Sequence, residues 1–141
     1  MASDRTTSLI GKQVKVAGNT VTLNGQVPLN YSLQGNASKA TVSIYDANGA
    51  LVKTAVLGQT AAGNNSYSWD GTNNTGNQLP VGGQYTFTVT AVDGSGQAIT
   101  ATPLTTGTVT GMAFDNNMTY LTINGNTRVQ LGDVREILGG N

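Results

Sequence analysis

The most regular alternation in this chain is Tyr85-Thr86-Phe87-Thr88-Val89-Thr90-Ala91-Val92. Every second residue is apolar, and three threonines fill the positions between. Successive side chains of a β-strand point to opposite faces, so this pattern predicts a strand with one buried face and one face toward solvent.

Working outward, the same pattern predicts more strands, separated by turn-forming residues. Residues 40–45 and 51–57 flank the turn Asp46-Ala47-Asn48-Gly49, with Val42 and Ile44 facing inward. A short strand around Tyr67 and Trp69, a lead-in at 27–33 and a return strand at 98–104 after Asp93-Gly94-Ser95-Gly96 complete the series. A spacing of about ten residues is typical of a small β-sandwich, which we place at residues 33–105.

Composition favours an all-β protein and excludes several kinds of chemistry. The 141 residues include no Cys and no His, which excludes Ser-His-Asp and Cys-His nucleophiles as well as zinc sites built from Cys and His. Seven basic residues balance seven acidic ones, and this leaves no electrostatic footprint for nucleic acid. Lys12 and Lys15 lie close together and are explained as a solvated strand face.

Two further absences limit the possible partners. No apolar run approaches the roughly 18 residues of a membrane span, and Met1 to Arg5 contain no secretory signal. We therefore expect no membrane, nucleic-acid, metal or cofactor partner. Only 10% of the residues are charged, so little repulsion opposes self-association, which favours a structural or assembly role.

The two ends of the chain carry the same pentapeptide pattern. Val21-Thr22-Leu23-Asn24-Gly25 near the start matches Leu121-Thr122-Ile123-Asn124-Gly125 near the end. Asn-Gly is the strongest short hairpin signal, so both pairs are predicted to form hairpin turns. We hypothesise that residues 8–32 and 106–138 pair into one small barrel or open sheet, with the sandwich inserted between them. Chance similarity is the alternative.

The last segment allows two structures. Residues 133–138 have the spacing of one helical turn with Asp133 as N-cap, and they fit a final edge strand equally well.

Candidate sites are few, and each has a structural explanation. Asp46 and Asp93 sit in turns, where Asp accepts hydrogen bonds from backbone amides. The run Asp70-Gly71-Thr72-Asn73-Asn74-Thr75-Gly76 resembles a calcium loop, but Thr72 stands at its third position and no bidentate Glu follows, which favours Asx turns. Trp69 with Tyr67 fits either a sugar-stacking platform or sandwich core.

One group of residues resembles a known family. Trp69-Asp70-Gly71, then Gly76, Pro80, Gly83 and Tyr85 resemble the immunoglobulin-like repeat of the bacterial flagellar hook-capping family, also called basal-body rod modification proteins. Residues 42–49 are similar to its first hairpin, residues 8–14 to its preceding segment, and residues 109–131 to its C-terminal end. One departure is that Pro80-Val81-Gly82-Gly83 is one residue longer than the family's pattern.

The resemblance implies a fold and a role. The fold is all-β, with a fibronectin-III or immunoglobulin-like sandwich inserted into a small tudor-like barrel formed by both chain ends. The role is a non-enzymatic scaffold that forms an oligomeric cap at the tip of the growing hook and helps hook subunits polymerise. Such proteins leave the cell through the flagellar type III export system without a cleaved signal peptide, and an N-terminal region missing here suggests a C-terminal core fragment.

In this interpretation the motif residues are structural. Trp69, Tyr85, Phe87, Val42 and Ile44 are predicted core residues, and no residue is predicted to act in catalysis. The alternative is a carbohydrate- or surface-binding β-sandwich module of an exported protein, which predicts an exposed Trp69. An enzyme built from scattered Asp, Tyr or Lys residues is a third hypothesis.

Overall fold

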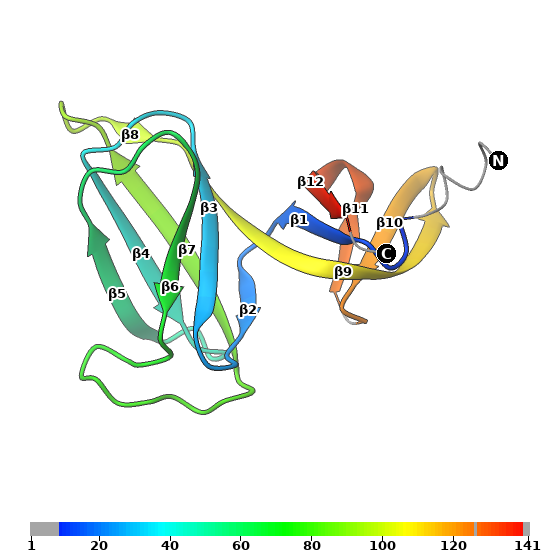
Figure 1. Ribbon diagram of the computed structural model, residues 1–141, viewed down its shortest axis with the longest axis horizontal. Coiled ribbons are helices and arrows are strands. Elements are labelled where there is room, and N and C mark those ends of the chain that lie inside the picture. Colours follow the sequence, from blue (N-terminus) through cyan, green and yellow to red (C-terminus); the bar gives the residue numbers. More distant parts are fainter. Residues whose placement is uncertain (1–8, 126, 140–141) are drawn as a thin grey trace. The chain divides into compact units, whose positions relative to one another are not determined.

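The computed structural model describes residues 9–125 and 127–139. They form β-strands joined by turns (Figure 1), and within these ranges the helical structure is limited to one 3-10 turn, η1 (Leu131–Asp133). The chain divides into two compact units. Gly18–Thr105 form one unit, which we call the sandwich, and the segments before and after it form the other, which we call the curled sheet.

Two antiparallel sheets make up the sandwich. The first has the order β2 (Thr20–Thr22), β7 (Gln84–Val92), β4 (Lys39–Tyr45) and β5 (Leu51–Leu57), with β8 (Ala98–Ile99) also paired to β7. The second sheet joins β6 (Gly63–Trp69) to β3 (Val27–Leu33), which in turn pairs with the first part of β9 (Ala101–Asp115).

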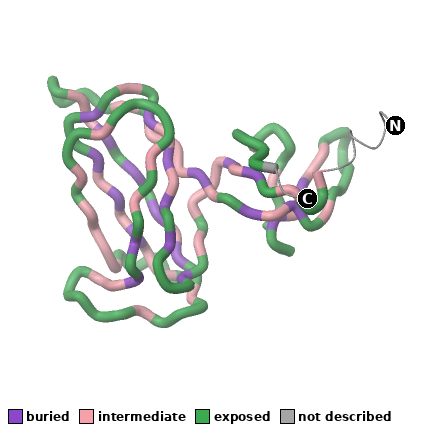
Figure 2. Tube along the Cα trace, viewed as in Figure 1, coloured by how far each residue is buried: buried purple, intermediate pink, exposed green. Residues whose placement is uncertain are grey.

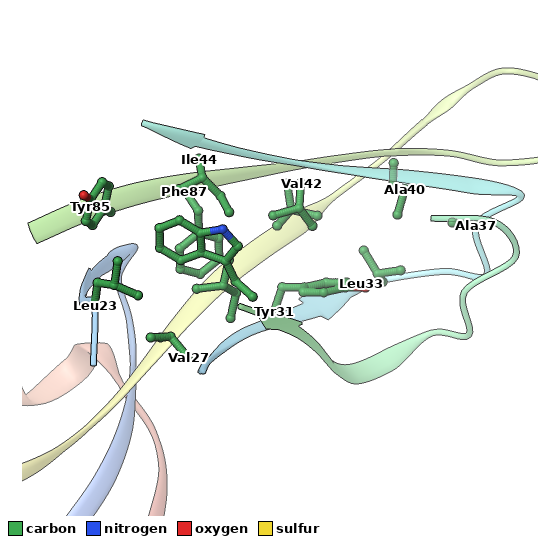
Figure 3. Packing of buried hydrophobic residues seen from close by; sticks show 14 residues of the cluster. Leu23, Val27, Tyr31, Leu33, Ala37, Ala40, Val42, Ile44, Tyr85 and Phe87 are labelled. Carbon is green, nitrogen blue, oxygen red and sulfur yellow. The ribbon is translucent and has the colours of Figure 1, made fainter. Parts of the chain in front are cut away.

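The sandwich core lies between these sheets and follows the alternation in the sequence. All five predicted core residues, Trp69, Tyr85, Phe87, Val42 and Ile44, are buried. Figure 3 shows Val42, Ile44 and Phe87 pointing from one sheet toward Tyr31 and Leu33 of the other. The threonines of β7 lie on its opposite face. Strand β7 therefore has one buried face and one face toward solvent, as predicted.

The curled sheet combines the two ends of the chain. Its strand order is β11 (Thr127–Gln130), β10 (Met118–Ile123), the second part of β9, β1 (Gln13–Ala17) and β12 (Val134–Gly139). A smaller core holds it together, made of Val14, Val16, Val109, Leu121 and Ile123. In β1, β3, β4 and β7 the buried positions alternate with exposed or half-buried ones (Figure 2).

The predicted fold class is confirmed. The ends of the chain pair directly, with Val14 of β1 opposite Ile137 of β12, and the sandwich occupies the chain between them. Of the two structures predicted for residues 133–138, the edge strand is observed and the helical turn is not. Val134–Gly139 form β12, which pairs with β1.

The predicted boundary at residues 32 and 33 is wrong, because the sandwich begins at Gly18. Strand β2 pairs with β7, and β3 pairs with β6 and β9, so residues 18–32 belong to the sandwich. The four residues from Val27 to Leu33 that alternate inward carry too much apolar surface to leave the sandwich core.

The predicted hairpin at Asn24-Gly25 is wrong for the same reason. These residues connect β2 in one sheet to β3 in the other. Leu23 is fully buried, its N–H donates to Gly83 O at 2.9 Å, and its C=O accepts from Gly82 N at 2.8 Å. The chain is thus held to the segment before β7 and cannot fold back on β2.

Two other connections differ from expectation. The predicted return strand at 98–104 is interrupted at Thr100, where the chain leaves β7 and joins β3 in the other sheet. A tight hairpin that was not among the predicted turns joins β9 to β10, with Asp115 opposite Met118. Asn116 and Asn117 fill its two-residue turn with φ of 51° and 64°, a conformation that Asn tolerates better than most residues.

Candidate functional site

The Trp-Asp-Gly motif closes one end of the sandwich core. Trp69 ends β6 with an exposed fraction of 0%, and its ring meets Tyr85 edge to face with centroids 5.1 Å apart. The indole Nε1–H donates to Thr72 O at 3.0 Å, which satisfies its one polar group. Tyr67 lies on the same face of β6, is half-buried and packs against the sandwich core. Because Trp69 is buried, the two rings do not form an exposed aromatic platform.

Asp70 and Gly71 shape the turn that follows Trp69. Asp70 Oδ1 accepts from Thr72 N at 3.1 Å and from Thr72 Oγ1 at 2.7 Å. Gly71 is buried with φ of 84°, and a Cβ built on it would lie 2.8 Å from Leu23 Cδ1. Only glycine fits both the backbone and the space, which explains why the motif reads Trp-Asp-Gly.

Three turns of the sandwich share one hydrogen-bonding pattern. In each, an Asp or Asn side chain accepts from the amides two and four residues later, and its own backbone N–H donates to the carbonyl four residues on. The three turns begin at Asp46, Asn73 and Asp93. A glycine with positive φ stands three residues after each, namely Gly49, Gly76 and Gly96.

These turns explain the predicted calcium-like run. Asp70 and Asn73 each direct an oxygen at backbone amides and threonine hydroxyls of their own loop. No group of three or more Asp or Glu side chains gathers anywhere in the described ranges. The predicted Asx turns are therefore the structure of this segment.

The remaining motif residues lie on the approach to β7. Pro80 is exposed, and Gly82 within the Pro80–Gly83 segment has a positive φ of 93°. Gly83 lies under the Tyr85 ring, where an added Cβ would approach Tyr85 Cε1 to 3.2 Å. This segment and Gly71 together hold Leu23, so the motif positions converge on one end of the sandwich.

Asn124-Gly125 forms the predicted turn in the curled sheet. Both residues have positive φ, 54° and 79°, between the paired ends Ile123 and Thr127. Asn124 also accepts from Thr108 N through Oδ1 at 3.0 Å and donates its backbone N–H to Thr108 O at 2.8 Å. The same dipeptide therefore sets a hairpin here and a layer crossing at residues 24–25.

The pKa values of three side chains near these turns are shifted by hydrogen bonds or by burial. The pKa of Asp70 is lowered chiefly by its bond from the Thr72 hydroxyl, and that of Asp93 by its bond from the Ser95 hydroxyl. Burial raises the pKa of Tyr67, and the Asp70 carboxylate adds to that shift. Each of these groups belongs to a turn or to the edge of a packed strand, and no two are arranged as an acid–base pair.

Exposed apolar side chains gather at the hairpin of β9 and β10. Met112 and Phe114 lie on β9 and Met118 begins β10, and Phe114 has an exposed fraction of 73%. Arg128 stacks on Tyr120, with its Cζ 3.8 Å from the ring centroid. It also forms a salt bridge to Asp115, with 3.6 Å between Arg128 Nη2 and Asp115 Oδ2. The register places Met112 and Phe114 on one face of the hairpin and Met118, which lies opposite Asp115, on the other. Two exposed apolar side chains on one face indicate a contact surface.

Comparison with known proteins identifies the family. Residues 18–95 match the model of the FlgD Ig-like domain. The chain belongs to the FlgD Ig-like domain family. The match spans more than half of the chain and covers most of the sandwich.

Curated FlgD proteins are similar over nearly the whole chain. It is 33% identical over 140 residues to the basal-body rod modification protein FlgD of Escherichia coli, and 31% identical over 141 residues to that of Salmonella typhimurium. These alignments cover 93% and 94% of this chain and 60% of each relative. The chain thus spans three fifths of the length of these relatives.

Solved FlgD structures share the fold. FlgD from P. aeruginosa superposes with a TM-score of 0.77 at 27% identity, covering 93% of this chain and 98% of that one. FlgD from Xanthomonas campestris, described as giving insights into hook capping essential for flagellar assembly, gives a TM-score of 0.73 at 26% identity and covers 94% and 96% of the two chains. The similarity therefore includes the curled sheet, which the family model does not reach.

No helix in the described ranges has the length and apolar character to cross a membrane.

Proposed function

We propose that this chain is the core of a non-enzymatic scaffold that caps the growing flagellar hook and promotes addition of hook subunits. The observation that carries the proposal is similarity to FlgD proteins along more than nine tenths of the chain, in both sequence and fold. The protein acts through surface contacts with hook subunits and with further copies of itself. It works outside the cell, at the hook tip, after export by the flagellar type III system.

The structure's own features support a scaffold over the alternatives. The carbohydrate-binding module requires an exposed Trp69, and this side chain is buried. An enzyme requires clustered reactive groups, whereas the titratable side chains with shifted pKa values serve turns and packing. Both observations support surface contact as the means of action.

The hairpin of β9 and β10 is the surface that we assign to hook-subunit contact. It carries Met112, Phe114 and Met118 in an exposed position. Aromatic residues and Met are enriched in protein interfaces relative to the rest of the surface.

Complementation tests the role and the surface together. In a flagellated cell lacking its own FlgD, we expect the full-length protein to restore hooks and a Phe114→Ser variant to restore few. Val81→Ser is the matched control, because Val81 is similarly exposed, at 67%, but lies in the sandwich. Normal hooks in the deletion strain would refute the role, and normal hooks with Phe114→Ser would refute the surface alone.

A further inference from the structure

Strand β5 is the outer strand of its sheet. The sheet order ends at β5, whose register partner is β4. Leu51 and Val56 have exposed fractions of 53% and 65%, and Lys53 is the one charged residue among the seven of the strand. An apolar edge with little charge is a ready template for another strand.

A single residue from a distant loop occupies this edge. Asn74, in the loop between β6 and β7, donates its backbone N–H to Val52 O at 2.9 Å. Its side-chain Oδ1 accepts from Thr54 N at 3.0 Å. Asn74 therefore supplies one donor and one acceptor to successive outward-facing groups of β5, as a neighbouring strand would.

The loop holds Asn74 in place through the turn that begins one residue earlier. Asn73 N donates to Asn77 O at 2.9 Å, and Gly76 N donates to Asn73 O at 3.0 Å. The oxygen Asn73 Oδ1 accepts from Thr75 N and Asn77 N, both at 3.0 Å. The hydrogen bonds that close the turn are local and do not involve β5.

The sequence of β5 is complementary to itself. It reads Leu51-Val52-Lys53-Thr54-Ala55-Val56-Leu57, which is nearly the same in both directions. In an antiparallel pair about a two-fold axis at Thr54, Leu51 faces Leu57, Val52 faces Val56, and Thr54 faces its own copy. Lys53 faces Ala55, so like charges do not oppose each other, and Thr–Thr and aliphatic cross-strand pairs are favourable.

We propose that Asn74 is a removable cap on β5, and that uncapped β5 pairs antiparallel with β5 of a second copy about a two-fold axis at Thr54. The cap occupies the centre of that pairing, because Thr54 N–H and Val52 C=O are among the groups the second strand needs. This inference does not rest on the role in hook assembly, since the chain itself is the only component.

Removing the side-chain acceptor of Asn74 tests the first part of the proposal, that Asn74 caps β5. Asn74→Ala and Asn74→Leu leave Thr54 N–H without its protein acceptor. We expect dimerisation of the purified chain to tighten by about thirtyfold, because each of the two copies no longer gives up one such hydrogen bond on pairing. Asn74→Asp keeps the acceptor oxygens and should behave as the original protein. Sedimentation equilibrium measures the dimer, and the fluorescence of the buried Trp69 shows that each variant is folded.

Disulfide crosslinking tests the second part of the proposal, the antiparallel register of β5 with its copy. Because the chain contains no Cys, an introduced Cys can pair only with its own copy. Directly opposed residues that exchange backbone hydrogen bonds lie about 5.5 Å apart between Cα atoms, within disulfide range. In the Asn74→Ala background, Thr54→Cys should form a disulfide with its own copy under mild oxidation. Val56→Cys should not, because Val56 faces Val52.

The outcomes separate cleanly. A dimer that forms with Asn74→Ala or Asn74→Leu and crosslinks at residue 54 alone supports the proposal. Folded variants that remain monomeric at millimolar concentration overturn it. Equal crosslinking at residues 54 and 56 overturns the proposed register and with it the two-fold pairing.

Discussion

At the scale of single residues, each of the three residues of the Trp-Asp-Gly motif has a different structural role. Trp69 fills the end of the core, Asp70 fixes the turn, and Gly71 makes room for Leu23. The sequence alone places these residues in a motif and predicts that Trp69 is buried. It does not reveal Leu23 as the partner of Gly71, because that contact joins segments almost fifty residues apart.

Gly71→Ala should destabilise the sandwich by about 2–4 kcal/mol, because it adds strain at positive φ to an overlap with Leu23 Cδ1. Urea unfolding followed by the fluorescence of Trp69, the one Trp of the chain, measures the change. Gly58→Ala is the control, since Gly58 lacks positive φ and an added Cβ meets no atom within 4 Å. Equal unfolding midpoints for both variants would contradict this account of the motif.

Asp93 should contribute to the pH dependence of stability. Its folded pKa is lowered, first by the Ser95 hydroxyl and then by backbone amides. The carboxylate therefore stabilises the fold above the unfolded pKa of about 4, and this contribution is lost as the pH falls through the lower folded pKa. Asp93→Asn keeps an acceptor oxygen but does not titrate, so its unfolding midpoint should fall less on acidification. Midpoint curves that run parallel from neutral to acid pH would argue against this.

At the scale of elements, the chain uses one turn design three times in the sandwich. Asp or Asn begins each turn, and a glycine with positive φ follows three residues later. The sequence predicts turns at Asp46 and Asp93, because Asp and Gly are common turn residues. For the third copy the sequence predicts Asx turns within residues 70–76 but does not single out Asn73, because many Asn and Gly residues compete in this long polar loop.

One turn contains its own matched pair of glycines. Gly96 has φ of 86°, whereas Gly94 lacks positive φ and has open space around an added Cβ. We expect Gly96→Ala to lower the free energy of unfolding by about 1 kcal/mol or more, and Gly94→Ala to change it by less than about 0.5 kcal/mol. Chemical denaturation of the two variants measures the difference. A larger loss from Gly94→Ala would show that the turn is held differently.

Local sequence predicts the strands well and their partners less well. The period of two in β3, β4 and β7 reflects a buried face, so it is visible in the sequence. Asn24-Gly25 and Asn124-Gly125 are locally alike, yet one crosses between sheets and the other forms a hairpin. The difference lies in Leu23, which is bonded to Gly82 and Gly83, residues far along the chain. The cap of Asn74 on β5 is likewise set by a contact between distant segments.

At the scale of the whole molecule, each unit has a core of its own. The sandwich core includes β3, whose alternating residues are buried from Val27 to Leu33. The sequence predicts that the chain ends pair, because both carry strand patterns without enough strands to stand alone. The boundary of the units could not be predicted, since β2 and β3 show the same alternation as the strands of either unit.

An excised sandwich should test that boundary. We expect residues 18–105 to fold alone, with a buried Trp69 and a cooperative unfolding transition. Residues 33–105 should not fold, because they lack Leu23, Val27, Leu29 and Tyr31 of the core. Fluorescence and circular dichroism of the two fragments measure this. A cooperatively folded 33–105 fragment would place the boundary at residue 33 after all.

The hydrogen bond from Gly18 N to Pro103 O, 3.1 Å long, brings together the two points where the chain enters and leaves the sandwich. For the curled sheet this has an entropic consequence. Pairing β1 with β12 across an unfolded stretch of roughly 90 residues would cost about 4 kcal/mol in loop closure. A folded sandwich removes that cost by acting as a short link between the ends. We therefore expect folding to be ordered in time, with the inserted unit first and the sheet that surrounds it in sequence second.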